Sequence, residues 1–210
     1  MATLYGVGGS PFVRKVRVVC AEKGITYDHE PVFPGTVDRQ ISPLGKIPGW
    51  KDEHGPLSDS SVICAYLERK KSTPALYPKD DYQYARALWF EEYADTALLG
   101  VFGPKIFFKK VVGPKFMGQK FEQAEIDKAW TEEAPPLLDY LEGQLEGDWL
   151  VGNAFSIADI AVGSEFVNLY LAGYRPDPKR WPKLVAYVDR VHARPTFAPL
   201  IKEDQAFLAG

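Results

Sequence analysis

The chain has 210 residues and a mass of 23.5 kDa, a length that suits two small domains better than one large one. Hydrophobic residues make up 46% of it and charged residues 25%, which excludes a disordered, collagen-like or coiled-coil chain. With 25 basic and 28 acidic side chains, the formal charge is -3. Such a chain lacks the positive field that attracts nucleic acid or an anionic membrane, so we expect small or local partners.

The two cysteines, Cys20 and Cys64, are too few for a disulfide framework. Each lies in an apolar run, which predicts buried free thiols. The N-terminus has neither a basic leader nor an apolar segment of secretory length, and no apolar run approaches the roughly 18 residues that a membrane helix needs. We therefore expect a cytoplasmic protein that does not use a membrane.

The first 75 residues alternate predicted strands and helices. A strand over 2–7 leads into the turn residues 8–10, and a helix follows from Pro11 to about Lys23, where Gly24 ends it. The other predicted elements are a strand over 27–33, a helical turn over 37–41, two antiparallel strands joined by a turn at 52–55, and a helix over 59–70. This order of elements predicts an α/β domain.

Residues 73–81 contain two prolines and no hydrophobic periodicity, which is typical of a linker. Beyond them the spacing of apolar residues is helical throughout. Helices are predicted over 82–110, 121–133, 136–146, 156–173 and 182–193, with breaks at Gly113–Pro114, Pro135–Pro136, Gly147, 176–178 and Pro195. The sequence therefore predicts an α/β domain over 1–75 and an all-helical domain over 82–210.

One local signal in the helical half is strong. Ser156 stands where it can cap a helix, and the carboxylate of Asp159, three residues later, can accept a hydrogen bond from the Ser156 backbone N–H. Phe155 and Ile160 flank the pair as in a hydrophobic staple. We interpret this motif as structural.

Four motifs, taken in order, carry a family resemblance. They are Ser-Pro-Phe-Val-Arg-Lys at 10–15, Pro-Leu-Gly-Lys-Ile-Pro-Gly at 43–49, Leu-Ser-Asp-Ser-Ser-Val-Ile at 57–63, and Gly-Asn-Ala-Phe-Ser-Ile-Ala-Asp at 152–159. Over essentially its whole length the chain resembles the cytosolic glutathione transferase family, in its serine-type, bacterial- or plant-like branch. The resemblance implies a thioredoxin-like N-terminal domain that binds glutathione and a C-terminal helical-bundle domain that shapes the electrophile pocket.

Ser10 is the candidate catalytic residue. An ordinary thiol, with a pKa of about 8.5, is only about 3% thiolate at pH 7, and lowering that pKa by two takes about 2.7 kcal/mol. A helix N-terminus contributes about 0.3 to 2 kcal/mol and a hydrogen bond to a charged acceptor about 1.5 to 3. Ser10, directly before Pro11, can supply both. The alternatives are that Ser10 only caps the helix, or that the hydroxyl of Tyr5 stabilises the thiolate, as a tyrosine does in other branches.

The resemblance also implies the residues that hold glutathione. A cis peptide bond at Ile47–Pro48 would leave the backbone of Ile47 free to pair with the cysteinyl part of glutathione. Asp59 and Ser60, at the start of a helix, would bind the γ-glutamyl ammonium and carboxylate, although the family more often has Glu where Asp59 stands. Lys46 could pair with the glycyl carboxylate. The alternatives are a trans proline at a strand edge, a plain helix cap, and an exposed lysine.

The predicted function is therefore glutathione transfer to small, mostly apolar electrophiles. Glutathione is then a co-substrate, no metal is required, and the resemblance implies a homodimer. Alternative functions are a glutathione-dependent peroxidase, reductase or isomerase, and a non-catalytic ligand-binding or adaptor protein. Thiol transfer through a mixed disulfide is disfavoured because Ser10 stands where that chemistry needs cysteine. The basic and aromatic stretch over 105–116, at this net charge, indicates a pocket wall or helix core rather than a nucleic-acid site.

Overall fold

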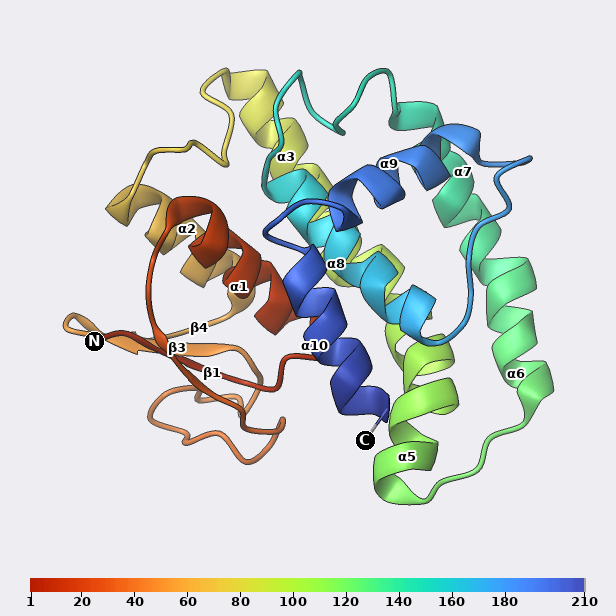
Figure 1. Ribbon diagram of the computed structural model, residues 1–210, viewed down its shortest axis with the longest axis horizontal. Coiled ribbons are helices and arrows are strands. Elements are labelled where there is room, and N and C mark those ends of the chain that lie inside the picture. The colour runs from red at the N-terminus through yellow and green to blue at the C-terminus, as the bar shows by residue number, and fades with distance from the viewer. Residues whose placement is uncertain (210) are drawn as a thin grey trace. The chain divides into compact units, whose positions relative to one another are not determined.

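The computed structural model describes residues 1–209, which form two compact units. One unit contains Met1–Pro78 together with the C-terminal segment from Pro195, and the other contains Lys79–Arg194. The N-terminal part of the first unit is the predicted α/β domain, and the second unit is helical (Figure 1).

The first unit is built on a four-stranded sheet of order β2-β1-β3-β4. Its strands are β1 (Thr3–Tyr5), β2 (Asp28–Glu30), β3 (Gly49–Asp52) and β4 (Gly55–Ser58). β1 is parallel to β2 and antiparallel to β3, and β3 and β4 form the predicted antiparallel hairpin. The sheet therefore has the mixed pairing that the βαβ and ββα order requires.

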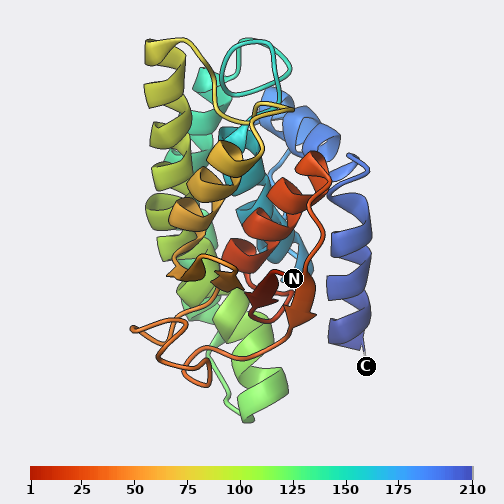
Figure 2. The same ribbon diagram turned by 90° about the vertical axis from the view of Figure 1, so that its left-hand side faces the viewer.

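Two helices, α1 (Pro11–Lys23) and α2 (Ser60–Lys70), pack on each other over one side of this sheet (Figures 1 and 2). The apolar side chains of α1 that are spaced at helical intervals, among them Val13, Val16 and Val19, are fully buried. Gly24 ends α1 in the left-handed conformation, as predicted, with φ of 57°. The expected helical turn over 37–41 is present as a single turn and not as a helix, because the Ser42 N–H donates to the Asp38 carbonyl four residues earlier, at 2.9 Å.

The second unit is a helical bundle around α8 (Ile157–Leu171), whose residues from Ile157 to Leu169 are all buried. Its other elements are α3 (Asp81–Tyr93), η1 (Ala94–Leu98), α4 (Leu99–Val101), η2 (Phe102–Val112), α5 (Gly113–Met117), α6 (Gln123–Lys128), η3 (Ala129–Glu133), α7 (Ala134–Gln144) and α9 (Pro182–His192). The predicted capping box is present at α8, where the Ser156 N–H donates to Asp159 Oδ2 at 2.9 Å. This confirms the structural interpretation of that motif.

Two predicted helix breaks are wrong. The chain stays helical through Gly113–Pro114 and through Pro135–Pro136. In both places a π-helical segment ends just before the prolines, which then lie in the first turn of a new α-helical segment. Each proline removes a backbone N–H donor directly after a π-helical segment, where the regular α-helical bonding pattern is already interrupted.

The C-terminal helix α10 (Ala198–Ala209) was not predicted from the sequence. It belongs to the first unit, where it lies along α1 (Figures 1 and 2). Asp204 is the residue of α10 that is buried, and because it is polar, the sequence of this helix shows only a weak apolar periodicity.

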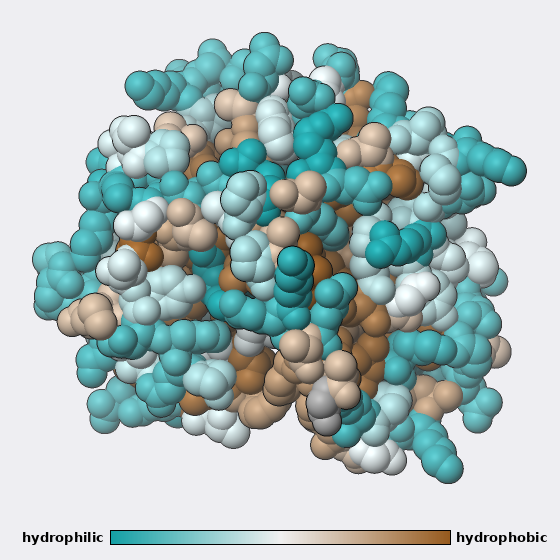
Figure 3. Space-filling model, viewed as in Figure 1, coloured by the Kyte–Doolittle hydropathy of each residue, from teal (hydrophilic) through white to brown (hydrophobic). Residues whose placement is uncertain are grey.

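On the face of the molecule drawn in Figure 3, hydrophilic residues predominate and apolar ones gather in smaller areas. Within residues 1–209, no helix is long and apolar enough to cross a membrane.

Candidate functional site

Strand pairing brings three predicted site segments to one end of the sheet. Gly49, the first residue of β3, pairs with Tyr5 on one side and with Ser58 on the other. Tyr5, Gly49 and Ser58 thus form one row across the sheet. The segments that adjoin this row are the loop to Ser10, the Ile47–Pro48 peptide, and the start of α2 at Asp59. Because neighbouring strands lie about 4.8 Å apart, these segments are neighbours although roughly 10 to 50 residues separate them in sequence.

Ser10 is the N-cap of α1. Its Oγ accepts a hydrogen bond from the Val13 backbone N–H at 3.4 Å, a long bond that uses one lone pair. A serine hydroxyl can accept and donate at the same time, so the capping bond leaves the hydroxyl proton available for a thiolate. The cap and the catalytic role are therefore compatible.

The loop that leads to Ser10 packs closely on the cis-proline segment. Gly6 has φ of 140°, a conformation that side chains other than glycine rarely adopt. A Cβ atom on Gly6 would lie 2.6 Å from Val13 Cγ2 and 3.0 Å from Ile47 Cβ. The backbone after β1 thus contacts both α1 and Ile47 at a distance that only glycine permits.

The Ile47–Pro48 peptide bond is cis, as the resemblance implied, and both residues are buried. They precede β3, so Ile47 lies outside the paired strands. A second cis bond, Thr73–Pro74, lies in the linker and was not predicted. Lys46 is exposed, next to Gly45, whose carbonyl accepts from the Gly35 N–H at 2.8 Å and closes the base of the loop between β2 and β3.

Asp59 and Ser60 begin α2. The Asp59 carboxylate caps the helix by accepting from the backbone N–H groups of Ser61 and Val62 at 2.9 and 3.2 Å, and its φ of 78° is a strained value for a residue other than glycine. Ser60 is buried at the helix start, where the positive end of the helix favours a bound carboxylate. Strain of this kind is concentrated at functional sites.

A buried lysine joins the starts of the two helices. Lys15 of α1 is 1% exposed, and its Nζ donates to Ser61 Oγ at 3.0 Å. Lys15 is not predicted as a site residue from the sequence, because a basic residue in an amphipathic helix resembles a solvated one. Its place between Val13 and Val16 in a largely buried helix is the signal that could have identified it.

The two cysteines are buried free thiols, as predicted. Burial raises the pKa of Cys20 to about 12, so this thiol stays protonated at neutral pH. In the part of the chain that the structure describes, no three His, Cys, Asp or Glu side chains gather closely enough to hold a metal ion.

Models of known protein families match most of the chain. Residues 4–75 match the glutathione S-transferase N-terminal domain and residues 107–204 the glutathione S-transferase C-terminal domain. The chain is 30% identical over 205 residues to the uncharacterized GST-like protein YibF of Escherichia coli K12, covering 93% of this chain and 96% of that protein. It is 31% identical over 157 residues to human glutathione S-transferase theta-2B, covering 73% of this chain and 63% of that protein. The chain belongs to the glutathione S-transferase family.

Solved structures of the family have the same fold. A theta class glutathione S-transferase from Xanthomonas axonopodis pv. citri, solved with glutathione bound, superimposes with a TM-score of 0.82 and 25% identity, covering 95% of this chain and 96% of that one. A glutathione S-transferase from Rhodospirillum rubrum F11 has a TM-score of 0.84 and 25% identity, with 95% and 91% covered. Both likenesses extend over the thioredoxin-like and the helical parts of the chain.

Proposed function

We propose that the protein conjugates glutathione to small, mostly apolar electrophiles in the cytoplasm, with the Ser10 hydroxyl as the donor that stabilises the glutathione thiolate. The supporting observation is the row Tyr5–Gly49–Ser58, because it brings the start of α1, the cis-proline segment and the start of α2 together. A tripeptide with two carboxylates, an ammonium and a thiol needs such separate polar contacts in one place.

In this proposal each segment has one task. Ile47 and Pro48 present backbone to the cysteinyl part, Asp59 and Ser60 receive the γ-glutamyl end, and Lys46 faces the glycyl carboxylate. Ser10 donates its hydroxyl proton to the sulfur while the N-terminus of α1 adds its positive field. Residues 1–75 thus hold glutathione, and residues 82–210 determine which electrophile reacts.

The test separates binding from chemistry. The wild-type protein should be retained on immobilised glutathione and should turn over at least one of the aryl halides, epoxides, enones or hydroperoxides. Ser10→Ala should be retained equally well but conjugate about 10- to 150-fold more slowly, which corresponds to the loss of a charge-assisted hydrogen bond of about 1.5 to 3 kcal/mol. A Ser10→Ala protein with the wild-type rate would remove Ser10 from the reaction and make Tyr5 the next hydroxyl to substitute.

The proposal includes a homodimer. Helix α3 exposes four large side chains, with exposed fractions from 38% to 74%: Tyr82, Tyr84, Leu88 and Trp89. Large apolar side chains gathered on one short helix are typical of a protein interface. The 23.5 kDa chain should therefore elute at about twice its mass, and Leu88→Arg should shift it towards the monomer. A wild-type monomer peak that does not change with concentration would contradict the dimer.

A further inference from the structure

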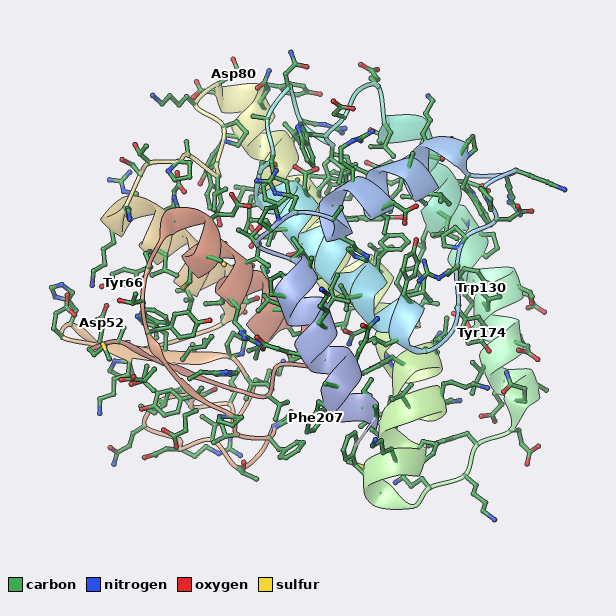
Figure 4. The ribbon with its side chains drawn as sticks, viewed as in Figure 1. Asp52, Tyr66, Asp80, Trp130, Tyr174 and Phe207 are labelled. Carbon is green, nitrogen blue, oxygen red and sulfur yellow. The ribbon has the colours of Figure 1, made fainter. Side chains whose placement is uncertain are left out.

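The C-terminal segment is tied to α1 at both ends of that helix. At the far end from Ser10, Thr196 Oγ1 donates to Glu22 Oε1 at 2.6 Å. Near the start of α1, Arg14 donates to Asp204 Oδ2 through Nε at 2.9 Å and through Nη2 at 2.6 Å. Helix α10 therefore runs along α1 and ends beside the loop that carries Ser10, where Phe207 is labelled in Figure 4.

Of these contacts between the C-terminal segment and α1, the ion pair between Arg14 and Asp204 is buried. The two side chains are 1% and 4% exposed. A second pair, Arg17 with Glu203 at 2.6 Å, lies next to it and is open to solvent on the glutamate side. Separating the partners of a buried pair leaves an uncompensated charge in the protein interior. The two side chains of a buried pair are therefore held together more strongly than those of a surface pair.

The Ser10 loop rests directly on these charged groups. A Cβ atom on Gly8 would lie 3.2 Å from Arg17 Nη1 and 3.2 Å from Asp204 Oδ1, so the loop backbone at Gly8 lies close to both side chains. Beside the loop lies a cavity of about 160 Å³, whose lining includes Val7, Gly8, His29, Asp204 and Phe207.

The loop needs such support because of its composition. The loop between Tyr5 and Ser10 has four residues, and three of them are glycines, whose backbone is the least restricted of any residue. On the sheet side it is fixed by the hydrogen bond that His29 Nε2 makes to the Gly6 carbonyl at 2.7 Å. On the α10 side its close neighbours at Gly8 are the side chains of Asp204 and Arg17.

We propose that Asp204 is a positioning residue for Ser10: by fixing Arg14 and the Gly8 backbone, it sets where the Ser10 hydroxyl meets the glutathione sulfur. This inference rests on the proposed role of Ser10 as the thiolate donor. A catalytic hydrogen bond is sensitive to displacements of about half an ångström. The C-terminal helix thus acts on the reaction through the loop, without contact between Asp204 and glutathione.

The test uses Asp204→Asn and measures the pKa of the bound glutathione thiol from thiolate absorbance across pH. Loss of positioning weakens the Ser10 hydrogen bond and should raise that pKa by about 0.5 to 1, with a rate about 3- to 10-fold lower at pH values below it. Removal of a negative charge would by itself lower the thiol pKa. A raised pKa therefore supports positioning, and an unchanged or lowered pKa overturns it.

Two further variants keep the test decisive. Thr196→Val removes the hydrogen bond between the C-terminal segment and the far end of α1, so it should lower stability without moving the thiol pKa. If Asp204→Asn does not fold, Gly8→Ala displaces the loop from its own side and should raise the thiol pKa in the same direction. A Gly8→Ala protein with the wild-type thiol pKa would overturn the inference.

Ser10→Ala, measured in parallel, separates the two proposals. If it raises the thiol pKa while Asp204→Asn does not, only the positioning role fails. If Ser10→Ala leaves the thiol pKa unchanged, the proposed role of Ser10 fails, and the role of Asp204 fails with it.

Discussion

Replacing Asp52 with asparagine should destabilise the first unit in a pH-dependent way. Asp52 lies at the end of β3, and Figure 4 shows it below Tyr66 of α2. Its Oδ2 accepts from the Tyr66 hydroxyl at 2.6 Å and from Lys70 Nζ at 3.0 Å, and its Oδ1 accepts from the His54 N–H at 3.0 Å. The carboxylate side chain is 2% exposed, so it joins the hairpin to α2 away from solvent.

The magnitude follows from these donors. In Asp52→Asn, either orientation of the new side-chain amide turns its NH₂ group towards a donor, so at least one donor loses its acceptor, at about 1 to 3 kcal/mol. The side chain of Lys70 is 38% exposed, so solvent screens its charge and the loss of its ion pair adds little to the change in free energy of unfolding. We expect Asp52→Asn to lower the free energy of unfolding by about 2 kcal/mol at pH 7.

The sign of the pH dependence is fixed by the pKa of Asp52. Burial raises this pKa, but the hydrogen bonds from Tyr66, His54 and Lys70 outweigh burial and hold it below its ordinary value. A carboxyl whose pKa is depressed on folding stabilises the protein above its unfolded pKa of about 4, and this stabilisation is lost as the pH falls through the folded pKa. The difference between wild type and Asp52→Asn should therefore be largest near neutral pH and shrink below about pH 4.

Urea unfolding followed by circular dichroism at a series of pH values measures this difference. Glu53→Gln is the matched control, because Glu53 also bonds Lys70, at 2.7 Å, but is 62% exposed and should matter little. Equal stability of wild type and Asp52→Asn at pH 7, or a difference that grows as the pH falls, would refute the reasoning.

Three further predictions concern single serines. Ser60→Ala should weaken glutathione binding in calorimetry while leaving the thiol pKa of bound glutathione nearly unchanged; wild-type affinity would remove Ser60 from the site. Ser10→Cys should gain a mixed disulfide with oxidised glutathione, seen as an adduct in intact-mass spectrometry, because a helix start favours a thiolate; no adduct would contradict this. Ser156→Ala should cost about 0.5 to 2 kcal/mol of stability with unchanged glutathione affinity; an unchanged melting temperature would refute its role as a cap.

Sequence reasoning identified the elements whose signals are local. Proline and glycine at the two ends of α1, the turn between β3 and β4, and the Ser156–Asp159 capping box each act within a few residues. Their physical causes are backbone dihedral preferences and hydrogen bonds between near neighbours. Such features can be predicted before any packing is known.

The features that the sequence did not reveal depend on distant partners. The breaks predicted at Pro114 and Pro135 fail because these prolines follow π-helical turns, where the regular α-helical bonding pattern is already interrupted. Helix α10 escaped notice because its buried residue, Asp204, is polar and finds its partner 190 residues away in Arg14. No local pattern marks a residue of that kind.

The candidate site combines both kinds of information. Its residues lie in short motifs that can be recognised one by one, but their common location follows from the pairing of Gly49 with Tyr5 and Ser58. A slip of this register by one residue would turn the buried Leu4 to the other face of the sheet. The burial of Leu4 therefore selects the register, and the register in turn sets how far the start of α1 lies from the start of α2. The apolar core thus determines the spacing of the polar groups that glutathione would meet.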